Sequence, residues 1–424
     1  MNFYKYPAPE LWPEICKRPL QEFQKIIPAV NSIIVAVQKK GDAALKTFSK
    51  KFDGVQLESL IVTENEVKEA TALVSASLKT ALRQAKKNIE AFHRAQKEAA
   101  RKIATAPGIV CWRESRAIEK VGLYIPGGSA PLFSTVLMLG VPARLAGCKE
   151  IVLCTPCNKE GKVHPVILYA AALCGITKII KVGGAQAIAA MAYGTETVPA
   201  VYKIFGPGNQ YVTAAKQLVQ NQVAIDMPAG PSEVLVIADE TANPDFVAAD
   251  LLAQAEHGPD SQVLLIATSA SLIKKTEQAI AGQLETLPRK EITAKALAHS
   301  RMVLVKNWQQ AIALSNYYAP EHLILSGKVP ASLLKNISAA GSVFIGHYSP
   351  ESAGDYASGT NHTLPTNGYA TAYSGVSLDS FCKKITFQQL SRRGLENIAD
   401  TVIAMAEAEG LQAHSNAVKV RITN

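Results

Sequence analysis

The chain has 424 residues, of which 48% are hydrophobic and 19% are charged, so it can build a large core or several domains. The longest apolar stretch, residues 165–177, holds about a dozen residues, well short of the ~20 that cross a bilayer. Residues 1–7 (MNFYKYP) carry a lysine and a proline where an export signal would be apolar. These features argue against disorder, a membrane span and export, and they predict a cytoplasmic protein.

The formal net charge of +9 raises the question of nucleic-acid binding. Lys and Arg are spread over expected helix faces together with acids, and the densest basic cluster, residues 97–102, fits a solvated face. The seven cysteines are an odd number in apolar context, which favours reduced core thiols over a disulfide framework. Only residues 154–157 (CTPC) have motif spacing, and they lack the surroundings of a redox or zinc motif.

The first hundred residues are expected to be mostly helical. Residues 1–28 are aromatic and proline-rich, which is typical of an arm that lies on another surface. Helical periodicity follows at 31–48 and 66–104, with a short strand candidate at 55–62 between them.

From residue 121 onward, short buried runs alternate with helical patterns, which indicates parallel βαβ units. Strands are expected in two sets, at 121–125, 151–154 and 179–182, and at 234–238, 263–267, 302–305, 323–325 and 342–345. Beyond residue 379 a helix is expected at 388–409, followed by a polar tail. The predicted fold class is therefore α/β, with two doubly wound, incomplete Rossmann-like lobes and helical N- and C-terminal extensions.

Residues 254–260 (QAEHGPD) form a candidate half of a metal site. Asn243 can cap a helix, Pro244 suits its first turn and Gly258-Pro259 stops it, so a helix is expected at 245–257. Gln254 and His257 then share one face of the last turn, where the helix dipole favours a cation. Both side chains could instead simply cap the helix and bond the next loop.

Three glycine-rich turns, at 124–129, 182–186 and 205–211, each adjoin a strand candidate and open onto a helical stretch. Backbone N–H groups at such turns can hold an anion. None of the turns is GxGxxG, so a nucleotide site is only weakly indicated.

Glu321 and His322 place an acid beside an imidazole at the start of an expected strand. Glutamate can position water, and histidine can take a proton near neutral pH. Adjacent strand residues point to opposite faces, so the pair could share one task only if the loop is irregular. Two ordinary surface residues are the alternative.

Residues 352–362 (SAGDYASGTNH) make a plausible binding loop, rich in glycine and serine, with one acid and one histidine. Near the C-terminus, a helix ends at Gly410 and leaves Glu409 and His414 close together. A histidine on a solvated tail would usually be inert. The other histidines lie in helix or connector contexts and are interpreted as structural.

Together these segments resemble the histidinol dehydrogenase family over nearly the whole chain. The stretches that carry the resemblance are 122–131 (GLYIPGGSAP), 206–211 (GPGNQY), 226–233 (DMPAGPSE), 254–260 (QAEHGPD) and 319–322 (APEH). The resemblance implies oxidation of L-histidinol through L-histidinal to L-histidine with NAD as hydride acceptor, in the last steps of histidine biosynthesis.

The resemblance also implies roles for individual residues. His322 would be the general base, and Glu321 would activate water. Ser232 and Glu409 would contact the substrate together with the zinc ligands, while Tyr124, Gln186 and Asn209 would contact NAD. Zinc, which has no redox chemistry, would orient the substrate. The zinc ligands implied in this way are Gln254, His257, Asp355 and His414.

Finally, the resemblance implies a homodimer in which the C-terminal segment of one subunit completes the other subunit's site. The expected division is an N-terminal arm (1–28), a zinc and substrate domain (29–120 with 233–378), an NAD-binding domain (121–232) and a C-terminal helical extension (379–424). No nucleic-acid or membrane partner is expected. Two competing interpretations remain, a zinc hydrolase, which would not need the glycine-rich turns, and a nucleic-acid-binding protein with a structural zinc.

Overall fold

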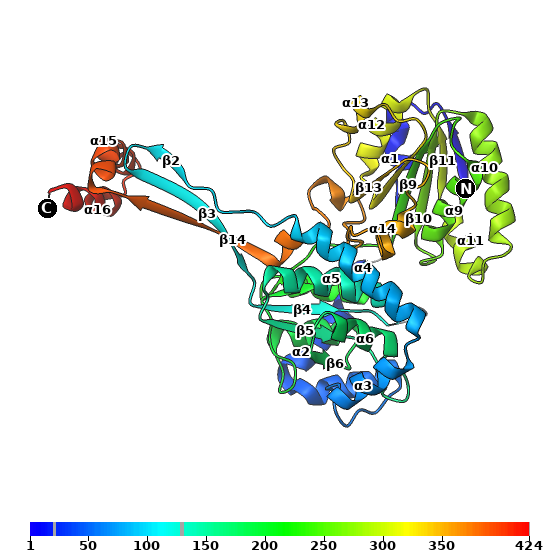
Figure 1. Cartoon of the computed structure of the whole chain (residues 1–424), viewed down its shortest axis with the longest axis horizontal. Coiled ribbons are helices and arrows are strands. Elements are labelled where there is room, and N and C mark those ends of the chain that lie inside the picture. Colours follow the sequence, from blue (N-terminus) through cyan, green and yellow to red (C-terminus); the bar gives the residue numbers. More distant parts are fainter. Residues whose placement is uncertain (20–22, 128–130, 424) are drawn as a thin grey trace.

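The computed structural model describes residues 1–19, 23–127 and 131–423. The chain forms two α/β lobes and a long arm that projects away from both (Figure 1). Among the described residues, no helix is long and apolar enough to cross a membrane.

The first lobe is built on a five-stranded parallel sheet with the order β6-β5-β4-β7-β8. This order is that of a doubly wound sheet, in which the winding direction reverses between β4 and β7. The strands are β4 (Lys120–Tyr124), β5 (Glu150–Cys154), β6 (Lys178–Ile180), β7 (Lys203–Phe205) and β8 (Ala224–Ile225), and the connecting helices are α5 (Phe133–Ala146), α6 (Pro165–Leu173), α7 (Gly184–Tyr193) and α8 (Gln210–Leu218).

Three N-terminal helices cover this first sheet, α2 (Phe23–Phe48), α3 (Glu64–Leu73) and α4 (Ala76–Arg94). Apolar residues of α2 share a core with α7 and α8, whereas those of α3 and α4 share the opposite core with α5 and α6. The structure thereby corrects the division that grouped 29–120 with 233–378. An amphipathic pattern shows which face of a helix is apolar, but not which sheet that face will cover.

Three local expectations for this region also change. The single helix expected at 66–104 is two helices, because the Ser75 side chain accepts a hydrogen bond from the Leu78 N–H and caps a new one. The strand candidate at 55–62 contributes only an isolated bridge between Ile61 and Ile180. Residues 103–106, which overlap the end of the expected helix, form a strand, and residues 109–117 form another where none was expected.

The second lobe holds a six-stranded parallel sheet with the order β1-β11-β10-β9-β12-β13. Its predicted strands are confirmed as β9 (Glu233–Ala238), β10 (Gln262–Ala267), β11 (Arg301–Leu304), β12 (His322–Ser326) and β13 (Ser342–Ile345). Helices cover both faces, namely α1 (Trp12–Ile15), α9 (Pro244–Ala255), α10 (Ala270–Leu284), α11 (Lys290–Ala298), α12 (Trp308–Tyr318), α13 (Ala331–Leu334) and α14 (Glu351–Tyr356).

The N-terminus belongs to this second lobe. Strand β1 (Asn2–Lys5) pairs in parallel with β11 and forms one edge of the sheet. Part of the segment expected to be an arm is therefore an edge strand of its own chain. Residues 20–22 of that segment lie outside the described residues.

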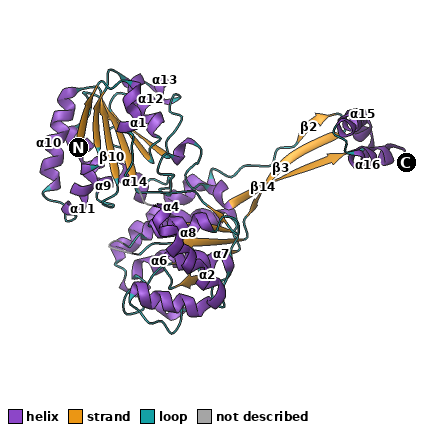
Figure 2. Ribbon diagram, turned by 180° about the vertical axis from the view of Figure 1, so that it is seen from behind, coloured by secondary structure: helices purple, strands orange, loops and turns teal. Residues whose placement is uncertain are grey.

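The projecting arm combines two distant parts of the sequence (Figures 1 and 2). Strand β3 (Ile109–Ala117) lies between β2 (Ile103–Ala106) and the long strand β14 (Cys382–Leu390), with antiparallel pairing from Cys382↔Ala117 to Leu390↔Ile109. Helices α15 (Arg392–Ala408) and α16 (Gln412–Thr423) lie at its far end. The expected helix is present as α15, but its first residues are strand and the polar tail is helical.

Candidate active site

Glu321 and His322 lie together at the amino end of β12. Between α12 and this strand, Ala319 adopts a left-handed backbone with φ 51° and is followed by Pro320, so Glu321 precedes the regular strand. A Glu321 Oε2 atom lies 3.6 Å from His322 Nδ1. The loop is thus irregular, and the alternation that would send the two side chains to opposite faces does not apply here.

The backbone of Glu233 contacts three side chains of this cluster. Its N–H donates to Glu321 Oε2 at 2.9 Å, and its carbonyl accepts from Gln254 Nε2 at 3.2 Å. The same carbonyl lies 3.1 Å from His322 Nδ1, and because a carbonyl can only accept, Nδ1 carries the proton of this bond. His322 Nε2 is therefore the nitrogen that remains for chemistry.

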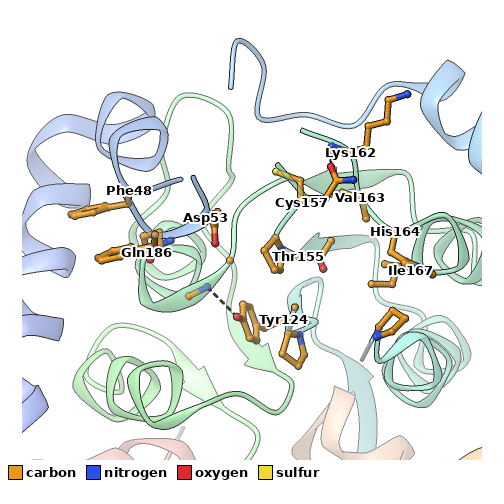
Figure 3. A pocket seen from close by; sticks show the side chains of 18 of the residues that line it. Phe48, Asp53, Tyr124, Thr155, Cys157, Lys162, Val163, His164, Ile167 and Gln186 are labelled. Atoms are coloured by element: carbon orange, nitrogen blue, oxygen red, sulfur yellow. Dashed lines mark hydrogen bonds between the residues drawn. The ribbon is translucent and has the colours of Figure 1, made fainter. Parts of the chain in front are cut away.

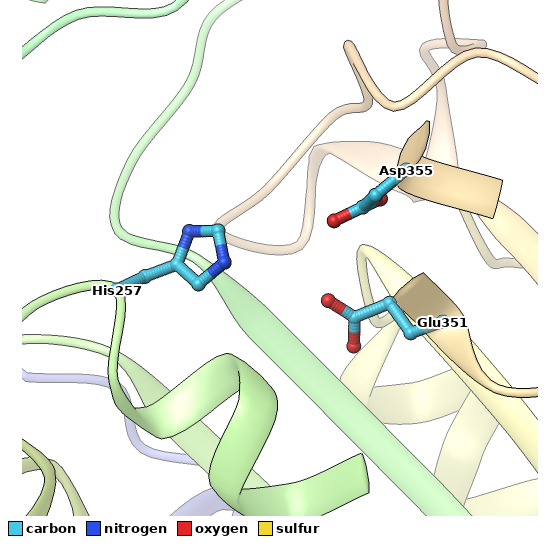
Figure 4. A group of neighbouring side chains, drawn as sticks. All are labelled: His257, Glu351 and Asp355. Atoms are coloured by element: carbon cyan, nitrogen blue, oxygen red, sulfur yellow. The ribbon is translucent and has the colours of Figure 1, made fainter. Parts of the chain in front are cut away.

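A group of metal-ligating side chains adjoins His322. His257, Glu351 and Asp355 bring ligand atoms within 4.8 Å of one another (Figure 4). Asp355 Oδ1 lies 3.6 Å from His322 Nε2. Sequence reasoning missed Glu351, although it precedes Asp355 by one helical turn in α14 and immediately precedes the predicted binding loop.

Several buried polar atoms in this cluster have no hydrogen-bond partner, namely Gln254 Oε1, His322 Nε2, Glu351 Oε2 and Asp355 Oδ1. Leaving such atoms unpaired is costly, so their convergence indicates a missing partner. Carboxylate oxygens and imidazole nitrogens are ligands that zinc accepts, and an amide oxygen is a compatible donor. The residues present therefore fit a bound divalent cation.

The charges of the cluster also favour a bound cation. Burial raises the pKa of Glu321 and of Glu351 to about 8 each. Burial opposes the charged form of His322, but the surrounding carboxylates, Glu351 first, outweigh it and raise the pKa of the imidazole to about 10. A cation among these carboxylates would offset their field and lower the pKa of His322, so that it could accept a proton near neutral pH.

The remaining sequence-predicted substrate residues lie in two places. Ser232 is half-buried, directly before β9 and next to Glu233. Glu409 is exposed at the C-cap of α15 and His414 is exposed in the first turn of α16, at the far end of the projecting arm (Figure 1). One chain therefore gathers Gln254, His257 and Asp355 around His322, but it does not bring His414 to them.

A cavity of about 1190 Å³ lies in the first lobe (Figure 3). The three residues predicted to contact NAD, Tyr124, Gln186 and Asn209, all line it. Tyr124 is the last residue of β4, and Gln186 and Asn209 come after β6 and β7, so all three lie at the carboxyl edge of the sheet. This edge includes the point between β4 and β7 where the winding reverses, which is the usual ligand position in such sheets. Residues 128–130 of the first glycine-rich turn lie outside the described residues.

Hydrogen bonds fix the polar groups of this cavity. The Gly184 N–H donates to the Tyr124 hydroxyl at 3.0 Å, and burial raises the pKa of that phenol to about 12, so it stays protonated. Asn209 caps α8 because its Oδ1 accepts from the N–H groups of Tyr211 and Val212, which leaves its amide nitrogen available to donate. The glycine-rich turns at 182–186 and 205–211 therefore open onto helices as predicted, α7 from Gly184 and α8 from Gln210.

A short segment after α14 connects the cluster to the first lobe. His362 Nδ1 lies 3.0 Å from the Asp355 carbonyl, and its Nε2 lies 3.0 Å from the Thr135 hydroxyl of α5. Beside it, Asn361 Nδ2 donates to the Met138 carbonyl of the same helix at 2.6 Å. The candidate metal site and the lobe that holds the cavity are thus joined by direct contacts.

Comparisons with known proteins agree along the whole chain. A profile of the histidinol dehydrogenase family matches residues 16–422. The chain is 57% identical over 423 residues to histidinol dehydrogenase of Bacteroides thetaiotaomicron, covering 100% of this chain and 99% of that protein. It is 55% identical over 412 residues to histidinol dehydrogenase of Vibrio vulnificus, covering 96% and 95%. The crystal structure of histidinol dehydrogenase from Elizabethkingia anophelis, 55% identical, superposes with a TM-score of 0.98 and covers 100% of this chain and 98% of that one. The chain therefore belongs to the histidinol dehydrogenase family.

Proposed function

We propose that this protein is an oxidoreductase of histidine biosynthesis that converts L-histidinol, through L-histidinal, to L-histidine with NAD as hydride acceptor. Membership of the family supports the reaction class. The observation that carries the finer proposal is the convergence of unpartnered atoms of Gln254, His322 and Asp355 at one site, joined to a lobe whose cavity Tyr124, Gln186 and Asn209 line.

Zinc would be held by Gln254, His257 and Asp355, with His414 of the partner subunit as a further ligand. When bound, zinc supplies a Lewis acid that orients the substrate, and it takes no part in electron transfer. Glu351, whose carboxylate lies in the same group, adds negative charge that favours a cation there. Ser232 and Glu409 of the partner subunit would contact the substrate.

His322 acts as the general base in this proposal. Its Nδ1 proton is engaged by the Glu233 carbonyl, so Nε2 is the atom that accepts the hydroxyl proton of the alcohol while hydride leaves the carbon. After water has added to the aldehyde, the same nitrogen accepts the hydroxyl proton of the hydrate as the second hydride leaves. Each oxidation therefore releases one hydride and one proton.

Glu321 activates the water that adds to the aldehyde. Its Oε2 accepts from the Glu233 N–H and from Gln254 Nε2, which fixes one edge of the carboxylate. Ionised, the carboxylate takes a proton from water as the oxygen attacks the carbonyl carbon. The two neighbouring residues thus perform successive steps on one carbon.

The first lobe would hold NAD in its cavity. The protonated Tyr124 hydroxyl and the free amide nitrogen of Asn209 are donors toward the acceptor groups of a dinucleotide. The N-terminus of α7, which begins at Gly184, lies in the same wall and favours anions such as a pyrophosphate.

A homodimer with shared sites is the proposed assembly. The projecting arm carries Glu409 and His414 far from the site of its own chain (Figure 1), and a second copy would supply the missing ligand. The free cysteines fit a reducing compartment, which supports the proposal that the enzyme works in the cytoplasm.

One experiment tests the proposed reaction and its metal together. Purified protein is mixed with L-histidinol and NAD, and NADH absorbance is followed before and after chelation, with metal analysis of both samples. We expect two NADH per histidinol, loss of turnover with loss of zinc, and recovery when zinc is returned. Absence of NADH formation by the zinc-loaded protein would contradict the proposal.

A further inference from the structure

A buried ion pair lies behind the Glu321–His322 cluster. Arg18 Nε lies 2.5 Å from Glu233 Oε1, and Arg18 Nη2 donates to Glu233 Oε2 at 2.9 Å. The Glu233 side chain is 2% exposed and that of Arg18 is 18% exposed. The Asn367 N–H completes the carboxylate's partners at 2.8 Å. Both oxygens of Glu233 are therefore fixed, one of them from two directions.

Arg18 also contacts the segment that leads into Glu321. Its Nη2 donates to the Tyr318 carbonyl at 2.7 Å, and its guanidinium lies 4.1 Å from the centre of the Tyr318 ring. The next residue, Ala319, holds the left-handed backbone that brings Glu321 and His322 to the same site. One guanidinium thus spans the starts of β9 and β12, which carry the cluster.

Glu233 connects the ion pair to the Glu321–His322 cluster. Its side chain is held by Arg18, while its backbone N–H and carbonyl hold Glu321, His322 and Gln254. A buried ion pair is weak evidence of stabilisation, because desolvation offsets its attraction. A bidentate arginine pair does, however, fix orientation, since its fork matches a carboxylate in only a few geometries.

We propose that the Arg18–Glu233 pair is a positioning device for the reaction. It fixes the Glu233 backbone, which in turn sets which nitrogen of His322 is free and where the Glu321 carboxylate lies. In this role Arg18 and Glu233 act only through the residues they hold. The inference rests on the proposed function, and it adds the N-terminal segment to the elements that determine catalytic geometry.

The test compares Arg18→Met, Arg18→Lys and the double variant Arg18→Met with Glu233→Gln. The double variant leaves no buried unpaired charge, so it retains the fold if the single variant does not. We expect kcat for NADH formation from L-histidinol to fall about 10–100-fold in the methionine variants, the usual cost of losing a supporting partner. The KM for histidinol should change less than kcat, and Arg18→Lys should recover part of the rate by keeping the charge.

Arg144→Met is the matched control. Arg144 also donates to backbone carbonyls, those of Cys174 and Gly175, but in the first lobe away from the cluster. It should lower thermal stability without lowering kcat. If kcat of the folded Arg18 variants equals that of wild type and Arg144→Met, the pair is merely structural and the inference is overturned. Wild-type turnover is measured alongside, so failure of the proposed reaction itself is recognised separately.

Discussion

At the scale of single residues, the cluster is a set of groups whose preferred charges conflict until a cation is added. Glu321, Glu351 and Asp355 surround one imidazole in a nearly water-free site. A buried carboxylate resists ionisation, yet ionised carboxylates are what a metal and a water-activating base require. The stability of the metal-free protein should therefore fall as pH rises, whereas the stabilisation by added zinc should increase.

Replacing His322 by Asn should lower kcat about 10²–10⁴-fold, the usual cost of a lost general base. Because the unpartnered oxygens of Gln254 and Asp355 remain, zinc content should stay near that of wild type. Steady-state kinetics and metal analysis check both points. His299→Asn, at an exposed position after α11, is the control and should behave as wild type. Substantial turnover by the His322 variant would rule out its assigned role.

Replacing Glu321 by Gln should slow the oxidation of L-histidinal more than the oxidation of L-histidinol. The amide keeps an oxygen for the Glu233 N–H but cannot take a proton from water. Single-turnover experiments started separately with the alcohol and the aldehyde measure the two halves. Equal slowing of both would argue against a water-activating role.

The metal-free protein should become less stable as pH rises. Because the folded pKa of Glu321 and Glu351 is raised from 4.5 to about 8, their protonated forms favour the native state below about pH 4.5, and this contribution is lost as pH rises through about 8. Zinc binds the ionised carboxylates, so added zinc should raise the melting temperature more at about pH 8 than at about pH 6.

Thermal unfolding of chelated protein across this pH range, with and without zinc, measures the effect. Glu351→Gln should flatten the pH dependence of the metal-free protein, whereas Glu240→Gln, at an exposed position after β9, should not. An unchanged slope in the Glu351 variant would show that this carboxyl does not titrate as argued.

At the scale of elements, the two candidate sites lie at opposite ends of the strands of their sheets. The cavity of the first lobe lies at the carboxyl ends of its strands, whereas the candidate metal site lies at the amino ends of β9 and β12. At the carboxyl edge of the second sheet, Asp239 instead accepts from the N–H groups of Thr241 and Lys328. That edge is thus occupied by the chain's own hydrogen bonds.

Replacing Gly184 by Ala should weaken NAD binding. Gly184 has φ +68°, and an added Cβ would lie 2.7 Å from Oε1 of Gln186, whose side chain must move. Loss of one hydrogen bond to NAD costs about 0.5–1.5 kcal/mol, so KM for NAD should rise about 2–10-fold. Gly282→Ala in α10, where nothing lies within 4 Å, should leave KM unchanged and stabilise the helix by about 0.5–1 kcal/mol. An unaltered KM in the Gly184 variant would remove Gln186 from the NAD contacts.

Most buried strands of the two sheets were predictable because they are short apolar runs followed by helical patterns, as in residues 233–238 and 262–267. Strands β7 and β8 were not predicted, because three and two residues are too few to form such a run. Strand β14 was not predicted either, because it lacks an apolar run and more than half of its residues are exposed, among them Lys383, Gln388 and Gln389. The packing of α2, α3 and α4 was missed because amphipathic helices do not identify their partner sheet. Glu351 was missed because an acid in a polar loop gives no sign of its burial.

The positions of the site residues were likewise predictable only where local sequence signals determine them. Gln254 lies in the last turn of α9 as expected, because Asn243 and Pro244 mark the start of that helix, but the helix ends at Ala255 and His257 follows its C-cap, Glu256. The approach of Glu321 to His322 depends on one left-handed residue, Ala319, which sequence patterns do not reveal because alanine rarely adopts it. The roles of Arg18 and Glu233 depend on contacts between residues 215 positions apart.

At the scale of the whole molecule, the shared site can be tested by complementation. Co-expressed His322→Asn and His414→Asn subunits should assemble at random, and each mixed dimer would hold one intact site, so about a quarter of all sites should be active. NADH formation by the co-purified mixture measures this. His322→Asn combined with His257→Asn is the matched control and should recover nothing, because both lesions lie in the body of the chain that holds them. Equal activities of the two mixtures would contradict sharing.

The projecting arm has a consequence for the amount of enzyme. The β3–β14 ladder carries α15 and α16 away from the lobes, so under the proposed sharing a solitary chain would hold a site without Glu409 and His414. Dilution below the dissociation constant of the dimer should then lower activity per chain while the fold persists. Total activity would rise more steeply than in proportion to enzyme concentration. A cell that makes few copies would therefore have less activity per chain.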